Sequence, residues 1–450
     1  MKIHTQKEAE DLIYASYLRA INSITENSDE KAKKPELTRK LLDYAGSPDK
    51  GEKYILVTGS KGKGSTSRFI SSLLSHLGFK VGLFTSPHLV KFNERIRIDG
   101  KAIPEDNFIR MSNKIKNGFD AIEKELPPDQ YQGPIGIALA LAVLYFKENK
   151  TDINVIECGR GGKYDDTNVL DNNWAVITPI MKEHIHQLGP DMSDIVLHKL
   201  GIIKSSTNYV YINKQTKDVF PIIENLLKNK EGISYYNQQF RSENVFIKEQ
   251  GTSFDVHTTN GSYDNVTVPL LGEFQAINAS AAVKVCEDVI GQAIDDDILT
   301  KCMEDIKWPG RCEVVKKEPT IILDGAINES SAKYIKDVIH GIHKSGEKNI
   351  ISIVGVPKDK DYQGVIRVLS DVSQQLFITK PDISHLTFPK DALEYAQTIL
   401  PESKEFAYLN EALDYAQTST EADIILVVGT QTFIGNAKRC LGHSLLDIGK

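Results

Sequence analysis

Short apolar runs alternate with helical patterns through the first half of the chain. Residues 54–58, 81–85, 153–157 and 175–178 are β-type runs, and residues 65–77 repeat apolar side chains at helical spacing. This alternation is typical of a mainly parallel sheet with helices on both faces. Ligands bind at the carboxyl ends of such strands, so a nucleotide site is expected at that edge.

The pattern changes in the middle of the chain. Residues 244–269 alternate polar and apolar positions around Gly251 and Asn260-Gly261, which predicts antiparallel hairpins, and a helix is expected over residues 275–290. The run Trp308-Pro309-Gly310-Arg311 then interrupts the helical pattern. Because proline and glycine together break regular structure, this run is predicted to be a hinge or linker.

Beyond the hinge the strand and helix alternation starts again. Strands are predicted at residues 320–323, 350–354, 376–379 and 424–428, with a helix at 331–339. The prediction is an α/β protein with two domains. Residues 1–307 form a P-loop mononucleotide-binding parallel-sheet domain with an N-terminal helical segment and hairpins, and residues 308–450 form a smaller Rossmann-like α/β domain.

Composition excludes several classes of function. The net charge of -7 argues against nucleic-acid binding, and Lys31, Lys33 and Lys34 are expected on a solvated surface. The five cysteines lack paired spacing, so neither disulfides nor a zinc site is indicated and a cytoplasmic location is expected. The longest apolar stretch, residues 135–146, is too short to cross a membrane and predicts a buried helix.

A glycine-rich loop joins the strand at 54–58 to the helix that follows. It comprises Gly59, Ser60, Lys61, Gly62, Lys63, Gly64, Ser65 and Thr66. Glycines let backbone N–H groups close around phosphates, Lys63 can reach the outer phosphates, and Ser65 or Thr66 can meet a metal. Val57 stands where the usual first glycine would be, and a surface turn is the alternative. The flanking strand and helix favour nucleotide binding.

The loop resembles that of dihydrofolate synthase/folylpolyglutamate synthase enzymes in the Mur ligase superfamily, in which an extra glycine follows the lysine. Residues 82–89 and 92–96 are similar to that family's second motif. The similarity continues through Asp165, Thr167 and Asn168 and extends from about Tyr54 to Gly435. Gly136 and Leu139 stand where the family often has Glu and Thr, and Tyr164 and Asp166 in the following loop also differ. The substrate-side residues have therefore changed more than the ATP machinery.

Magnesium ligands are expected from position and from the resemblance. Glu157 ends a buried strand, where a carboxylate suits a hard cation, although a surface acid is the alternative. The resemblance adds Ser86 and His184 as ligands, with Ser65 in the loop, and implies two magnesium ions. It also places Lys199 where the family carries a carbamylated lysine, an anionic oxygen ligand. A lysine paired with an acid is the alternative there.

Three further residues are expected to meet the nucleotide. The resemblance implies that Asn278 contacts adenine, that Arg311 meets the phosphates, and that Asp324 contacts the nucleotide from the second domain. ATP would then lie between the domains, and closure would assemble the site and exclude water. Lys63, His184 and Lys199 are the candidate catalytic residues.

The resemblance implies an ATP-dependent ligase that forms an acyl phosphate and transfers the acyl group to an amine, with ADP as product. The leading hypothesis is addition of L-glutamate to a pteroate or folate. The alternatives are a ligase of the same mechanism acting on another acid in a specialised pathway, and a nucleotide-binding regulator. A soluble monomer with small-molecule substrates is expected, with no membrane or nucleic-acid partner.

Overall fold

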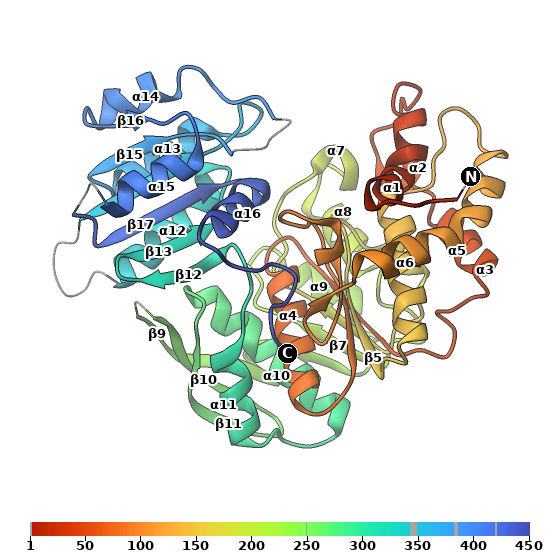
Figure 1. Ribbon diagram of the computed structural model, residues 1–450. Coiled ribbons are helices and arrows are strands. Elements are labelled where there is room, and N and C mark those ends of the chain that lie inside the picture. The colour runs from red at the N-terminus through yellow and green to blue at the C-terminus, as the bar shows by residue number, and fades with distance from the viewer. Residues whose placement is uncertain (1, 249, 343–348, 382–385, 419–420) are drawn as a thin grey trace.

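The chain folds into two lobes that meet along one side (Figure 1). The computed structural model describes residues 2–248, 250–342, 349–381, 386–418 and 421–450. The larger lobe holds the N-terminal part of the chain, and the smaller lobe holds β12 (Arg311–Lys317) and most of the chain that follows it. The connection between the lobes follows α11 (Asp296–Asp305) and includes the predicted hinge.

Eight strands form the sheet of the larger lobe, in the order β4-β3-β2-β5-β1-β6-β7-β8. Their bounds are β1 (Tyr54–Thr58), β2 (Val81–Phe84), β3 (Ile96–Ile98), β4 (Lys101–Ala102), β5 (Ile153–Glu157), β6 (Trp174–Ile177), β7 (Tyr209–Ile212) and β8 (Ile233–Tyr235). Six strands are parallel, and β3 and β4 add an antiparallel edge. Val57 on the central strand pairs with Glu157, so the glycine loop and Glu157 leave the sheet at one edge.

Helices cover both faces of this sheet. They are α1 (Gln6–Ala20), α2 (Asp29–Ala32), α3 (Pro35–Tyr44), α4 (Lys63–His76), α5 (Glu105–Glu123), α6 (Pro134–Glu148), α7 (Ile185–Leu188), α8 (Met192–Leu200), α9 (Phe220–Leu227), α10 (Glu273–Ile290) and α11, with 3-10 turns at Phe92–Arg95 and Asp166–Val169. Helices α4, α10 and α11 share a core with Val57, whereas α5, α6, α8 and α9 share one with Leu56. The alternating faces of β1 therefore separate the two cores.

Helix α6 is buried along almost its whole length, which explains its continuous apolar sequence. Within the described part of the chain, none of the helices combines the length and apolar character needed to cross a bilayer. The predicted buried helix is thus confirmed.

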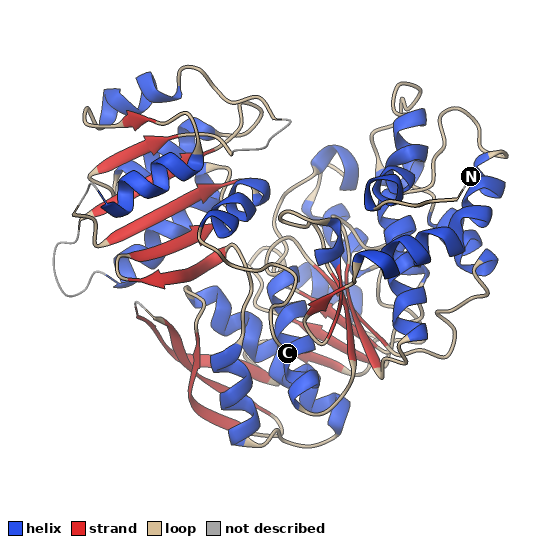
Figure 2. Ribbon diagram, viewed as in Figure 1, coloured by secondary structure: helices blue, strands red, loops and turns tan. Residues whose placement is uncertain are grey.

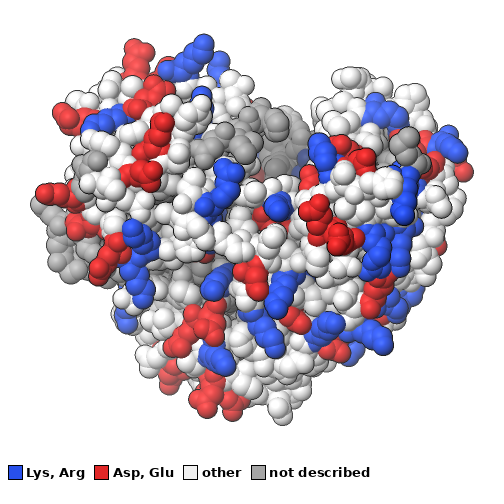
Figure 3. Space-filling model, viewed as in Figure 1, with Lys and Arg blue, Asp and Glu red and all other residues white. Residues whose placement is uncertain are grey.

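On the face shown in Figure 3, basic and acidic side chains are interspersed, without a broad surface of one sign.

The predicted hairpins form a separate antiparallel sheet in the order β11-β10-β9. Its strands are β9 (Phe240–Lys248), β10 (Gly251–Thr258) and β11 (Ser262–Val268). Val256 and Val266 of this sheet share a core with α10, which fixes the sheet to the outer side of the larger lobe. Ile247 also contacts the smaller lobe at Gly341.

The smaller lobe is a six-stranded sheet with helices on both faces (Figure 2). Its order is β12-β13-β17-β14-β15-β16, with β13 (Thr320–Asp324), β14 (Ile350–Gly355), β15 (Gln375–Ile378), β16 (Lys404–Glu405) and β17 (Ile424–Gly429). The helices are α12 (Glu329–Ile342), α13 (Tyr362–Ser370), α14 (Ala392–Ile399), α15 (Leu409–Thr418) and α16 (Gln431–Cys440). Only β12 runs antiparallel to its neighbour. The predicted α/β class is confirmed in both lobes.

The end of the chain returns to the larger lobe, beside α4 (Figure 1). Arg97 donates hydrogen bonds to the carbonyls of Leu445 and Leu446, and Arg68 donates to those of Ile448, Gly449 and Lys450. Residues 445–450 are therefore a tail that crosses from the second lobe to the helix of the glycine loop. The predicted domain boundary at residue 308 assigned these last residues to the second domain and did not anticipate their contacts with the larger lobe.

Candidate active site

The glycine loop closes tightly onto the end of the neighbouring strand. Gly59 has a φ of 141°, and a Cβ atom there would lie 2.0 Å from the hydroxyl of Thr178. Gly62, with a φ of 84°, is the residue before α4, which begins at Lys63. Because both positions require glycine, the loop can hold its backbone N–H groups around a phosphate at the helix N-terminus.

Glu157 lies in the middle of this edge and is buried. Its Oε2 accepts a hydrogen bond from the main-chain N–H of Ser86 at 2.9 Å. Burial raises the pKa of Glu157, and the ammonium of Lys63 is the strongest influence in the opposite direction. Lys63 itself donates to the carbonyl of Gly59 at 3.0 Å. Three predicted site residues, Lys63, Ser86 and Glu157, are thus brought together.

Lys199 is fully buried behind the glycine loop. Its Nζ donates to the carbonyls of Gly59 at 2.8 Å and Arg160 at 3.0 Å, and lies 3.3 Å from Oε1 of Glu183. Burial, reinforced by the nearby Lys63, lowers the pKa of Lys199 to about 8. With this pKa, roughly a tenth of the amine is neutral near pH 7.

His184 stands at the start of the short helix α7 in a left-handed backbone conformation, with a φ of 51°. Partial burial lowers its pKa, although the neighbouring Glu183 acts in the opposite direction. The imidazole is therefore neutral near pH 7, which is the form that binds metal ions. The structure shows no direct bond between His184 and Glu157 or Lys199.

The remaining loop residues differ in exposure. Lys61 is exposed, whereas Ser60, Ser65 and Thr66 are buried. Ser60 accepts from the main-chain N–H of Met181 at 2.9 Å, and Thr66 donates to Oδ1 of Asn278 at 3.2 Å. Asn278 on α10 is therefore tied to the helix of the glycine loop.

The second lobe adds Arg311 and Asp324, which pair across β12 and β13. Burial raises the pKa of Asp324, while the guanidinium of Arg311 opposes that rise. The same guanidinium also opposes the raised pKa of Glu157, so Arg311 brings positive charge from the second lobe toward the first. The geometry therefore assembles opposite charges across the junction of the two lobes.

The hinge itself contacts the glycine loop. A Cβ atom at Gly64 would lie 3.2 Å from the indole of Trp308, and 3.5 Å from Oε2 of Glu157. The extra glycine after Lys63 therefore leaves room for the hinge and for the buried carboxylate. Trp308 was predicted to lie in the hinge, but its contact with the glycine loop was not predicted, because no local sequence pattern indicates it.

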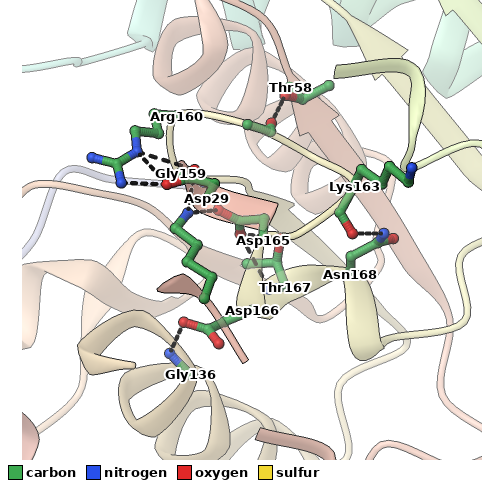
Figure 4. A network of polar contacts seen from close by, with 12 residues as sticks. Asp29, Thr58, Gly136, Gly159, Arg160, Lys163, Asp165, Asp166, Thr167 and Asn168 are labelled. Atoms are coloured by element: carbon green, nitrogen blue, oxygen red, sulfur yellow. Dashed lines mark hydrogen bonds and ion pairs between the residues drawn. The ribbon is translucent and has the colours of Figure 1, made fainter. Parts of the chain in front are cut away.

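A polar network lies beside this site, in the loop that follows Glu157 (Figure 4). Lys33 pairs with Asp29 at 3.2 Å and with Asp165 at 3.5 Å. The prediction that Lys33 belongs to a solvated surface was therefore wrong, because two buried acids draw it inward: Asp29, one helical turn earlier, and Asp165, 132 positions later in the sequence. The network fixes the N-terminal segment to the edge of the sheet.

The network also explains two departures from the family pattern. Asp166 accepts hydrogen bonds from the hydroxyl of Thr38 at 2.8 Å and from the N–H of Gly136 at 3.1 Å. A Cβ atom at Gly136 would lie 1.9 Å from that hydroxyl, and one at Gly133 would lie 2.2 Å from the Asp166 carboxylate. The two glycines thus make room for Asp166, which caps the start of α6.

The donor groups at the site suit magnesium bound together with a nucleotide. No three His, Cys, Asp or Glu side chains in the described ranges gather closely enough to hold a metal ion by themselves. The site offers the Glu157 carboxylate, serine hydroxyls and a neutral imidazole. Magnesium characteristically takes one or two carboxylates and completes its shell with phosphate oxygens and water, so this donor set fits.

Comparison with known proteins agrees with this geometry. Residues 57–286 match the Mur ligase middle domain, and residues 310–431 match the Mur ligase, glutamate ligase domain. A dihydrofolate synthase/folylpolyglutamate synthase of Bacillus subtilis is 28% identical over 421 residues, covering 91% of this chain and 95% of that protein. Its counterpart in Buchnera aphidicola subsp. Acyrthosiphon pisum is 30% identical over 327 residues, covering 72% and 74%.

The fold is also that of a solved relative. A folylpolyglutamate synthase of Mycobacterium tuberculosis, solved with ADP and AMPPCP, superposes with a TM-score of 0.82 at 24% identity, over 96% of this chain and 99% of that one. The chain therefore belongs to the Mur ligase family, in its dihydrofolate synthase/folylpolyglutamate synthase branch, and is an ATP-dependent, ADP-forming ligase.

Proposed function

We propose that this enzyme joins L-glutamate to the carboxylate of a pteroate or folate. The observation that carries the proposal is the buried Glu157, whose pKa is influenced by Lys63 of the glycine loop and by Arg311 of the second lobe. These charges surround the position where a nucleotide phosphate would lie between the lobes. The names of the relatives supply the two substrates.

The reaction proceeds in two steps. An oxygen of the acid's carboxylate attacks the γ-phosphorus of ATP, the bond to the β-phosphate oxygen breaks, and ADP leaves. The glutamate amine then attacks the carbonyl carbon of the acyl phosphate, loses a proton, and expels inorganic phosphate. Lys63 would neutralise charge on the transferring phosphoryl group, so electrostatic stabilisation is its role. Arg311 would add positive charge as the lobes close.

Magnesium would be held by Ser65, Ser86, Glu157 and His184, with nucleotide phosphates completing its shell. When bound, the metal supplies positive charge to the transferring phosphoryl group. Asn278 would contact adenine, while the backbone from Gly59 to Thr66 would bind the phosphates. Asp324 would hold the Arg311 strand in position, since it accepts from the main-chain N–H of Cys312 at 2.9 Å.

Lys199 is the candidate for carbamylation. Carbon dioxide reacts with a neutral amine, and the pKa of about 8 makes that form accessible near neutral pH. The carbamate would replace a buried cation by an anionic oxygen group beside the glycine loop. In the unmodified form, Lys199 is held by two carbonyls and Glu183, so the modification would rearrange those contacts.

A second candidate is the same ligase chemistry on a different acid. Asp166 and Gly136, two departures from the family pattern, contact each other in the polar network next to the site. These residues give this alternative a specific basis. A nucleotide-binding regulator is disfavoured, because such a protein has no need for the buried Glu157, His184 and Lys199 beside its phosphate loop.

The test is ADP release from the purified protein with ATP and magnesium. Dihydropteroate, tetrahydrofolate and unrelated carboxylic acids would each be combined with a panel of amino acids, and products identified by mass spectrometry. Glutamate-dependent turnover of dihydropteroate or tetrahydrofolate is expected. Turnover confined to an unrelated acid would replace the first candidate by the second, and no turnover with any acid would favour the regulator. Size-exclusion chromatography would test the expected monomer.

A further inference from the structure

Arg160 is fixed by a buried carboxylate on the N-terminal segment. Its Nε lies 3.1 Å from both oxygens of Asp29, and its Nη2 also donates to that carboxylate. The Asp29 side chain is 2% exposed, whereas 38% of the Arg160 side chain is exposed. Arg160 is thus a guanidinium held in one orientation with part of its surface open.

One edge of the guanidinium has no partner. Asp29 occupies Nε and Nη2, and Nη1 makes no hydrogen bond with any residue in the described part of the chain. Figure 4 shows that remaining nitrogen pointing away from the network. Lys33 shares Asp29 and has a second acid in Asp165, but Arg160 has no second ion pair among the described residues. The charge of Arg160 is therefore less completely neutralised than that of Lys33.

Arg160 is also close to the reaction side of the site. It lies three positions after Glu157, and its carbonyl accepts from Lys199 at 3.0 Å. Its positive charge contributes to lowering the pKa of His184, after the larger effect of burial. A substrate whose carboxylate lies near Lys63 and His184 would therefore have its adjacent atoms within reach of this guanidinium.

We propose that Arg160 binds a second carboxylate of the acid substrate, next to the one that is activated, and so selects acids that already end in glutamate. This inference rests on the proposed function. A pteroate has one carboxylate, which is the reacting group, whereas a terminal glutamate carries a second carboxylate, separated from the reacting one by three carbons. An arginine with a free edge recognises carboxylates through charge-assisted hydrogen bonds. Asp29 is a positioning residue in this arrangement.

The test compares kcat/KM for dihydropteroate and tetrahydrofolate, at saturating ATP and glutamate, in the unmutated enzyme and its variants. Arg160→Met removes the charge and keeps the length, Arg160→Lys keeps the charge and loses the planar fork, and Arg110→Met is the control. Arg110 is an exposed arginine paired with Glu148 on another surface. If dihydropteroate is not turned over, its inhibition constant against tetrahydrofolate replaces kcat/KM.

Arg160→Met should reduce kcat/KM for tetrahydrofolate by about tenfold to a hundredfold, mainly through KM. The values for dihydropteroate and the KM for ATP should stay within about twofold. Arg160→Lys should be intermediate, and Arg110→Met unchanged.

Equal losses for both acids would overturn the proposal and make Arg160 a structural residue of the loop, as would unchanged values for both. Thermal unfolding of each variant separates a folding defect from a binding defect. If Arg160→Met does not fold, the Arg160→Lys comparison decides, because an equal effect on the two acids there also overturns the proposal. Failure of the unmutated enzyme to use or bind either acid would instead remove the proposed function, and the inference with it.

Discussion

The Glu157 carboxylate accepts a hydrogen bond from the main-chain N–H of Ser86, with 2.9 Å between the nitrogen and Oε2. This bond joins the end of β5 to the segment that follows β2. Replacing Glu157 by glutamine keeps an oxygen for this bond but removes the charge. We expect activity to fall by at least about tenfold and the magnesium concentration for half-maximal activity to rise.

Magnesium titrations of ADP release would measure both effects, and Glu273→Gln, an exposed acid on α10, is the matched control. His184→Ala should shift the titration in the same direction. An unchanged magnesium requirement in both site variants would count against these two residues as ligands.

Among the described residues, the ammonium of Lys63 has a single hydrogen-bond partner, the carbonyl of Gly59. Because its proposed role is to neutralise charge on the outer phosphates, Lys63→Ala should reduce kcat by about a hundredfold or more while leaving the unfolding temperature nearly unchanged. The control is Lys61→Ala, an exposed lysine in the same loop, which should retain most of its activity. Near-native turnover by Lys63→Ala would refute the assignment of the phosphate loop.

Much of the fold follows from the apolar pattern. The strands at 54–58 and 153–157 were predicted with the bounds they have in the structure, because a buried parallel strand is a nearly continuous apolar run and glycine-rich segments follow both runs closely. The hairpins and the strands of the second lobe also follow from alternation and turn residues. These signals are local, so they survive in a single sequence.

The unpredicted features depend on contacts between distant residues. Arg160 and Asp29 are 131 positions apart, and no local pattern indicates that they pair. Lys33 lies in a polar, lysine-rich run whose composition favours a surface, yet its pairing with the nearby Asp29 and with the distant Asp165 makes it part of an interior network. Candidate site residues were predictable where a motif carries them, and the residues around them were not.

Asp166 should make the stability of the protein depend on pH. Burial, together with the neighbouring Asp165, raises the pKa of Asp166 to about 6. The folded state then binds this proton more tightly than the unfolded state does, so the contribution to stability is present below about pH 4 and is lost as the pH rises through about 6. The loss in the free energy of unfolding across this pH range is at most about 3 kcal/mol.

Urea unfolding of Asp166→Asn at several pH values would test this linkage. The unmutated protein should lose more stability between about pH 4 and 6 than the variant does, and Asp171→Asn, which changes an exposed acid paired with Lys50, should behave like the unmutated protein. Identical pH dependence in Asp166→Asn and the unmutated protein would show that Asp166 titrates normally.

The tail should stabilise the larger lobe through Arg68. Arg68 is 1% exposed, and among the described residues its guanidinium has four carbonyl partners, of which only that of Lys307 lies outside the tail. Removing residues 445–450 should lower the free energy of unfolding by about 2–4 kcal/mol, because a buried cation loses most of its acceptors. The same truncation should cost less in an Arg68→Met background. Equal costs in the two backgrounds, measured by urea unfolding, would show that Arg68 does not couple to the tail.

Lys199 provides the sharpest test of the proposed carbamate. Lys199→Ala should abolish activity and leave a buried space beside Gly59 and Glu183, which a small carboxylic acid such as acetate or propionate can enter. Partial recovery of ADP release should depend on the size and shape of the acid, whereas a general salt effect would be similar for chloride at equal ionic strength. Lys199→Met, which fills the space, should not be rescued.

Because the carbamate requires carbon dioxide, the unmutated enzyme should also lose activity on prolonged removal of bicarbonate and recover when it is restored. Full activity of Lys199→Ala without any added acid would exclude the carbamate and leave Lys199 as a structural partner of Glu183.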